Sequence, residues 1–133
     1  MNATHSSLFR PETAPVIVVV EDDGDSLEMM CALLEGAGHR AIGFSNGDAA
    51  LSYLRGHPSV KAIILDMLMP KMDGWQFRRA QERDPALAAI PVVVVSGLRV
   101  ARKNALDWGA SAFLVKPFSP DELLGAVASA ISG

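Results

Sequence analysis

The sequence predicts an α/β fold in which one doubly wound parallel sheet of five strands is covered by helices on both faces. Two observations predict it. Short apolar segments alternate five times with segments of helical periodicity along the 133 residues, which is typical of parallel sheets with right-handed crossovers. The apolar segments at residues 16–20 and 90–95 are rich in valine and isoleucine without polar alternation, as expected of strands buried on both faces.

The first half of the chain contains two of the strand-helix pairs. The first strand covers residues 16–20, and a helix follows from about residue 25, where apolar residues recur at helical spacing. Glycines end this helix before a short second strand at residues 40–44. An Asn-Gly-Asp turn then starts the second helix, residues 49–55.

The second half contains the other three pairs. Strands are predicted at residues 62–65, 90–95 and 111–115, and helices at about residues 73–82, 100–108 and 120–132. The last helix has a clear start, because Ser119 supplies a cap hydroxyl, Pro120 occupies the first position and two acids follow. We interpret residues 1–14 as a flexible leader and residues 15–133 as one domain, and the short leader and the end at Gly133 favour an independent protein.

Composition excludes several classes of protein. The chain has no apolar run long enough to span a bilayer and no secretory signal at its start, so we expect no membrane partner. Cys31 is the only cysteine, which rules out an internal disulfide and fits a cytoplasmic location. The net charge is −3 and the basic clusters are short, so we expect no direct binding of nucleic acid.

Polar side chains follow four of the predicted strands: Glu21 and Asp22, then Asp66, Ser96 and Lys116. The carboxyl ends of parallel strands meet at one edge of the sheet, where such folds place their chemistry. Crowded carboxylates repel one another, and Mg²⁺ relieves that repulsion because it prefers oxygen ligands and substrate phosphates. With a lysine and a hydroxyl beside them, these groups form a site that can accept a phosphoryl group on an aspartate nucleophile.

The same motifs resemble the receiver domain of two-component response regulators, in particular the stand-alone, chemotaxis-regulator-like kind. Residues 18–23 are similar to the first strand and acidic pair of that family, and residues 46–51 to the start of its second helix. Residues 66–74 are similar to its phosphoacceptor loop, and residues 115–118 to its last active-site turn. The resemblance covers about residues 15–131 and implies a flavodoxin-like strand order of 2-1-3-4-5.

The resemblance implies that Asp66 is the phosphoacceptor. Ser96 and Lys116 would contact the phosphoryl group, and Gly97 would donate its backbone N–H to it. Ser96 and Phe113 would act as the conformational switch. Lys116 would form a cis peptide bond with Pro117.

The resemblance also implies a magnesium site. Asp22 and Asp66 would bind Mg²⁺ directly, Glu21 would bind it through water, and the backbone carbonyl of Leu68 would be a further ligand. One alternative concerns the register of the acidic residues, because Asp22 and Asp23 could form the metal pair instead of Glu21 and Asp22.

We therefore expect a single-domain response regulator that is phosphorylated by a histidine kinase or a histidine phosphotransfer protein. Apart from catalysing its own phosphorylation and dephosphorylation, it is not expected to be an enzyme. A downstream protein would bind the face made by the fourth helix, fifth strand and fifth helix, where small residues could also admit a second copy.

Two alternatives stay open. The chain could be a receiver-fold interaction module that is not phosphorylated, or a receiver fragment of a larger hybrid kinase or regulator. A nucleotide-binding or phosphatase enzyme fits less well, because the chain lacks a glycine-rich phosphate loop and a second aspartate two residues after Asp66.

Overall fold

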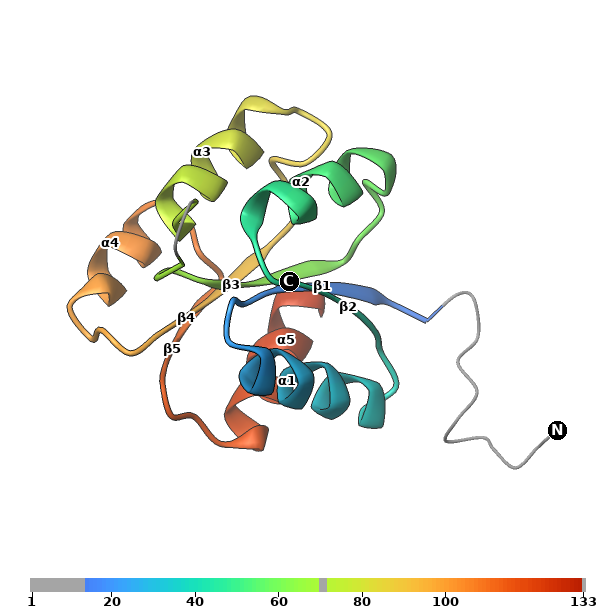
Figure 1. Ribbon diagram of the computed structural model, residues 1–133, viewed down its shortest axis with the longest axis vertical. Helices are drawn as coiled ribbons and strands as arrows, with labels where there is room; N and C mark the ends of the chain where they lie inside the picture. The colour runs from blue at the N-terminus through green and yellow to red at the C-terminus, as the bar shows by residue number, and fades with distance from the viewer. Residues whose placement is uncertain (1–13, 70–71, 133) are drawn as a thin grey trace, which may run out of the picture.

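The computed structural model describes residues 14–69 and 72–132, in which five strands alternate with five helices (Figure 1). The strands are β1 (Val16–Val20), β2 (Arg40–Phe44), β3 (Ala62–Asp66), β4 (Val92–Ser96) and β5 (Ala112–Val115). The helices are α1 (Gly24–Gly36), α2 (Gly47–Gly56), α3 (Gly74–Arg83), α4 (Ala101–Asp107) and α5 (Pro120–Ser132). The predicted element order is confirmed.

All strands are parallel and lie in the order β2-β1-β3-β4-β5, as the resemblance implies. Alternate residues of each strand face opposite sides of the sheet. Val18 and Val20 of β1 pack in the core cluster under α2, α3 and α4, whereas Ile17 and Val19 pack in the cluster under α1 and α5. The two helical layers of Figure 1 therefore cover separate apolar cores, which hold the strand ends at one edge.

Several element boundaries differ from the prediction by one or two residues, and two of these differences have a clear physical cause. Strand β4 begins at Val92 rather than Ile90, because Pro91 has no N–H and the N–H of Ile90 donates to the carbonyl of Leu87 in a turn (3.1 Å). Helix α4 begins only at Ala101, because Val100 stands at its N-cap position and offers no side-chain cap.

The expected leader, residues 1–14, lies outside the described residues except for Ala14. Ala14 is buried, and its carbonyl accepts a hydrogen bond from Nε of Arg40 (3.2 Å). None of the helices in the described part of the chain is both long enough and apolar enough to cross a membrane.

Gly74 joins the loop after β3 to α3 and allows no side chain. Its N–H donates to the carbonyl of Met67 (3.0 Å), and a Cβ at this position would lie 2.9 Å from Cα of Met67. Gly74→Ala is therefore expected to lower the free energy of unfolding by about 1–3 kcal/mol, because the backbone must shift. Urea unfolding measures this change. Gly125→Ala is the control, since a Cβ there has no atom within 4 Å; it should be neutral or stabilising by up to ~1 kcal/mol.

Candidate functional site

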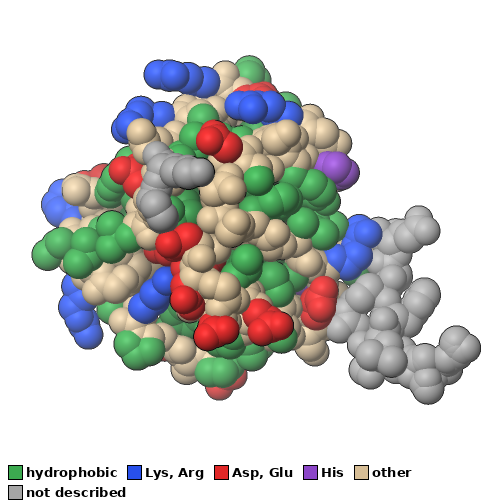
Figure 2. Space-filling view, in the orientation of Figure 1, with side chains coloured by type: hydrophobic (Ala, Val, Ile, Leu, Met, Phe, Trp, Pro, Cys, Tyr) green, Lys and Arg blue, Asp and Glu red, His purple; other side chains and the backbone are tan. Residues whose placement is uncertain are grey.

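The carboxylates predicted at the strand ends lie together in the structure. One oxygen each from Glu21, Asp22 and Asp66 lies within 4.8 Å of the others. Glu21 and Asp66 are buried, with 1% and 4% of their surface exposed, whereas Asp22 is exposed. Acidic side chains gather over the start of α1 and the strand ends on the face shown in Figure 2. The ends of the neighbouring strands β1 and β3 thus concentrate negative charge at the carboxyl edge of the sheet, which is partly open to solvent.

Asp23 has a different role from its two neighbours. Its side chain caps α1, where it accepts the N–H of Ser26 (2.9 Å), and it is not part of the carboxylate cluster. The structure therefore brings Glu21 and Asp22 together with Asp66 and uses Asp23 for the helix. In the same way, Asp73 caps α3 and forms a capping box with Gln76.

Lys116 follows β5, which is two strands away from β3 in the sheet, and its side chain reaches this cluster at the carboxyl edge of the strands. Its Nζ lies 2.6 Å from Oε1 of Glu21 and 3.5 Å from Oδ2 of Asp66. The peptide bond between Lys116 and Pro117 is cis, as expected. A buried carboxylate pair and an ammonium group are therefore in contact at the end of β3.

The other predicted residues come from the ends of β3 and β4 and from β5. Ser96 ends β4, is 1% exposed, and accepts the N–H of Leu98 on its Oγ (3.0 Å), and the exposed Gly97 follows it. Leu68 donates its N–H to Oδ1 of Asp66 (3.2 Å) and has an exposed side chain. The ring of Phe113 is buried in the core cluster under α2, α3 and α4.

The protonation of Asp66 reflects this crowding. Burial first, and then the hydrogen bond and charge of Glu21, raise the pKa of Asp66 to about 7. Burial lowers the pKa of Lys116, but its contacts with Glu21 and Asp66 outweigh burial and leave the pKa above its ordinary value. The cluster therefore has more negative charge than one lysine neutralises.

The residues present fit a hard divalent cation. The donors are all oxygens, the carboxylates lie close enough to share one ion, and an exposed acid leaves one side open to water. Mg²⁺ favours such a site, with one or two carboxylates, water and a phosphate oxygen as ligands. A cation would also relieve the repulsion from Glu21, which adds to the effect of burial in raising the pKa of Asp66.

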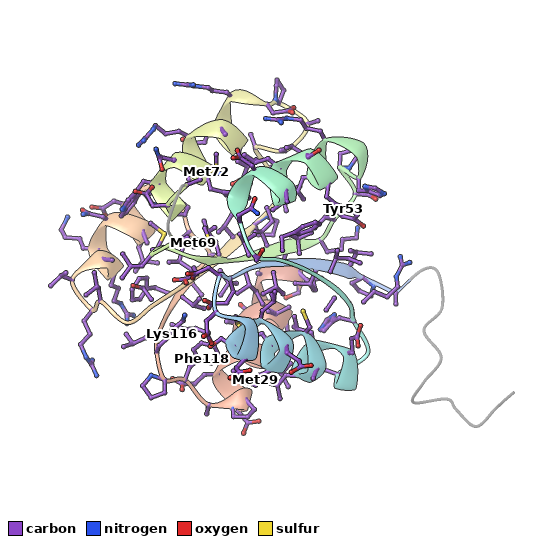
Figure 3. All side chains as sticks on the ribbon, in the orientation of Figure 1. Met29, Tyr53, Met69, Met72, Lys116 and Phe118 are labelled. Carbon is purple, nitrogen blue, oxygen red and sulfur yellow. The ribbon has the colours of Figure 1, made fainter. Side chains whose placement is uncertain are left out.

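A cavity of about 300 Å³ opens beside Lys116, between α1 and the segment that links β5 to α5. Its lining combines Met29, Lys116 and Phe118, labelled in Figure 3, with Ser26, Met30 and Pro117. Sequence spacing could not identify this cavity, because its two walls are far apart along the chain. Met29, which lines this cavity, is an apolar residue with 43% of its surface exposed.

Gln81 is a structural residue that the sequence analysis did not identify. It is fully buried in α3, and its Nε2 donates to the carbonyls of Leu87 (2.9 Å) and Ile90 (3.0 Å). Its Oε1 accepts a hydrogen bond from Arg78. These bonds hold the loop that leads into β4, and so help to place Ser96 at the other end of that strand.

Similar proteins identify the family to which this chain belongs. Residues 17–128 match the family described as the response regulator receiver domain. The phosphate regulon transcriptional regulatory protein PhoB of Escherichia coli is 34% identical over 113 residues, which are 84% of this chain and 49% of PhoB. The chain thus spans about half the length of the PhoB proteins.

Two further similarities extend over most of both proteins compared. The two-component response regulator ORR5 of Oryza sativa subsp. japonica is 30% identical over 112 residues, covering 83% of this chain and 84% of ORR5. The solved signal receiver domain of a signal transduction histidine kinase from Syntrophus aciditrophicus superposes with a TM-score of 0.80 at 32% identity. That superposition covers 90% of this chain and 92% of the other.

Proposed function

This chain belongs to the response regulator receiver domain family, and on that premise we propose that it accepts a phosphoryl group on Asp66 in a Mg²⁺-dependent reaction. The donor would be the phosphohistidine of a histidine kinase or of a histidine phosphotransfer protein. The observation that supports this most is the position of Asp66, which is buried at the end of β3 close to two other carboxylates and to Lys116. Receiver domains are signalling domains, and we propose no other enzymatic activity.

The cation would be held by the carboxylates of Asp22 and Asp66 and the backbone carbonyl of Leu68, with Glu21 acting through water. When bound, Mg²⁺ supplies positive charge that offsets the charge of the carboxylates and of the phosphoryl oxygens. Two charged groups of the cluster are buried, so their interactions with a bound cation are only weakly screened by solvent.

In the transfer itself, a carboxylate oxygen of Asp66 attacks phosphorus and forms an O–P bond as the N–P bond of the donor breaks. The electron pair of that bond goes to the histidine nitrogen, which takes up a proton. Lys116 and the hydroxyl of Ser96 stabilise the phosphoryl oxygens, and Gly97 donates its backbone N–H to one of them. Fixed donors of this kind act where charge develops in the transition state.

The output would be a change in binding. Phosphorylation adds about −1.5 to −2 charges at Asp66, and Ser96 would move toward the new group. The ring of Phe113 is buried in the core cluster under α2, α3 and α4. It would then shift and alter the surface formed by α4, β5 and α5. A downstream protein would bind this face, and a homodimer is the alternative use of it. The single-domain arrangement stays a prediction.

Ser96→Ala is expected to slow phosphorylation roughly tenfold or more, because it removes the hydroxyl that we propose as a hydrogen-bond donor to the phosphoryl group. The initial rate of phosphoryl incorporation measures this effect. Ser96→Thr is the matched control and should stay close to the wild type, since it keeps the hydroxyl. Equal rates for Ser96→Ala and the wild type would show that Ser96 has no role in the transfer.

Intact-mass measurement after incubation with acetyl phosphate tests the proposed function. We expect a gain of one phosphoryl group in the presence of Mg²⁺ and none when the metal is chelated. No gain from acetyl phosphate, and none from a purified histidine kinase, in folded protein that binds Mg²⁺ would reject phosphorylation and favour an interaction module.

A further inference from the structure

Lys116 contacts Glu21 more closely than it contacts Asp66. The distance from its Nζ is 2.6 Å to Oε1 of Glu21 but 3.5 Å to Oδ2 of Asp66. Only the first distance is that of a charge-assisted hydrogen bond. The ammonium group is therefore bonded to Glu21 and lies beside Asp66 without a comparable bond to it.

The second carboxylate oxygen of Glu21 also has a partner within the chain. Oε2 accepts the backbone N–H of Asp23 (3.1 Å), and the backbone N–H of Glu21 donates to the carbonyl of Phe44 (3.0 Å). Asp22 differs, since its carboxylate is exposed and forms no hydrogen bond or ion pair with other described residues. Glu21 is thus committed to the protein, whereas Asp22 is available to a cation.

We propose that Glu21 is the positioning residue of Lys116: its carboxylate holds the ammonium group beside Oδ2 of Asp66 and touches a cation only through water. This inference rests on the proposed role of Asp66 as phosphoacceptor. Glu21 follows β1 and Lys116 follows β5, so the ion pair extends across the ends of β3 and β4, which lie between them. A glutamate suits this span because it is one methylene longer than aspartate.

The arrangement has a chemical consequence for Asp66. Oδ1 of Asp66 already accepts the N–H of Leu68, which leaves Oδ2 as the oxygen better able to attack phosphorus. A strong hydrogen bond from Lys116 to Oδ2 would weaken that oxygen as a nucleophile. With Lys116 held by Glu21, Oδ2 keeps its lone pairs, and the ammonium group needs only a small shift to reach a phosphoryl oxygen. Glu21 therefore acts on the reaction through Lys116.

A double-mutant cycle tests this coupling. We expect Glu21→Gln to slow phosphorylation by acetyl phosphate at saturating Mg²⁺ roughly tenfold, and to have less than a ~2-fold effect in the Lys116→Met background. Glu21→Asp should resemble Glu21→Gln, because its carboxylate is too short to reach Lys116. Glu28→Gln, on the exposed side of α1, is the control for charge and should match the wild type. Equal slowing in both backgrounds, or a wild-type rate for Glu21→Asp, would overturn the proposal.

Nuclear magnetic resonance of the lysine ammonium group tests the same contact without any transfer. In metal-free, unphosphorylated protein, the slowly exchanging signal of Lys116 should persist in Asp66→Asn and disappear in Glu21→Gln. The opposite pattern, or no such signal in the wild type, contradicts the proposal. Because this measurement needs no phosphorylation, a wild type that keeps the signal but takes up no phosphoryl group would reject the proposed function and leave the positioning role intact.

Discussion

Asp66→Asn is expected to abolish Mg²⁺-dependent phosphorylation, with a fall in the initial rate of at least about a hundredfold. The amide keeps the shape of the side chain and an oxygen that can accept the N–H of Leu68, but it has no anionic oxygen to attack phosphorus. Intact mass and the rate of phosphoryl incorporation from acetyl phosphate are the measurements.

The same change at the two aspartates that follow β1 provides a comparison for this result. Asp23→Asn should keep the wild-type rate, because Asp23 caps α1 and asparagine caps a helix equally well. Asp22→Asn should require more Mg²⁺ for the same rate, because it removes a carboxylate from the cluster. If Asp66→Asn is still phosphorylated, and peptide mapping finds the group on another residue, the assignment of the phosphoacceptor is wrong.

The second large effect is on the stability of the metal-free protein, to which Asp66 should contribute progressively less as the pH rises toward 7. The pKa of Asp66 is about 7 in the folded protein, mainly because of burial, against 3.8 as its ordinary value. Since the folded state holds the proton more tightly, the contribution of this group is full below about pH 4 and is lost as the pH rises through 7. A shift of this size corresponds to a loss on the order of a few kcal/mol.

Replacement of Asp66 and addition of Mg²⁺ should both reverse that loss. At pH 8, Asp66→Asn is expected to be more stable than the metal-free wild type, and the difference should shrink toward pH 4. Saturating Mg²⁺ should stabilise the wild type at pH 8 and the variant much less, because binding to the folded state alone adds stability. Urea denaturation across this pH range measures both effects. If the free energy of unfolding of the metal-free wild type instead rises between pH 4 and 8 relative to that of Asp66→Asn, the raised pKa of Asp66 is wrong.

The sequence alone determined the fold and the chemical character of the site. Continuous runs of β-branched residues, such as Val16–Val20, can bury all their side chains only when both faces of the sheet are covered. This requirement made the parallel sheet predictable. The start of α5 was predictable because the interactions that form it are local. Ser119 and Glu122, which lie within four residues of each other, form reciprocal hydrogen bonds there. Asp66 and Lys116 were identified because each directly follows a run of apolar residues.

The tertiary structure decided how the site residues pair. Three consecutive acids follow β1, and their order does not reveal that Asp23 caps α1 while Glu21 is buried. The contact between Glu21 and Lys116 joins residues 95 positions apart, and it depends on the positions of β1 and β5 in the sheet. Burial and neighbouring charge, which raise the pKa of Asp66, likewise exist only when the strands are assembled. Local sequence specifies propensities and caps, but the distances between charges depend on how segments far apart in the chain pack together.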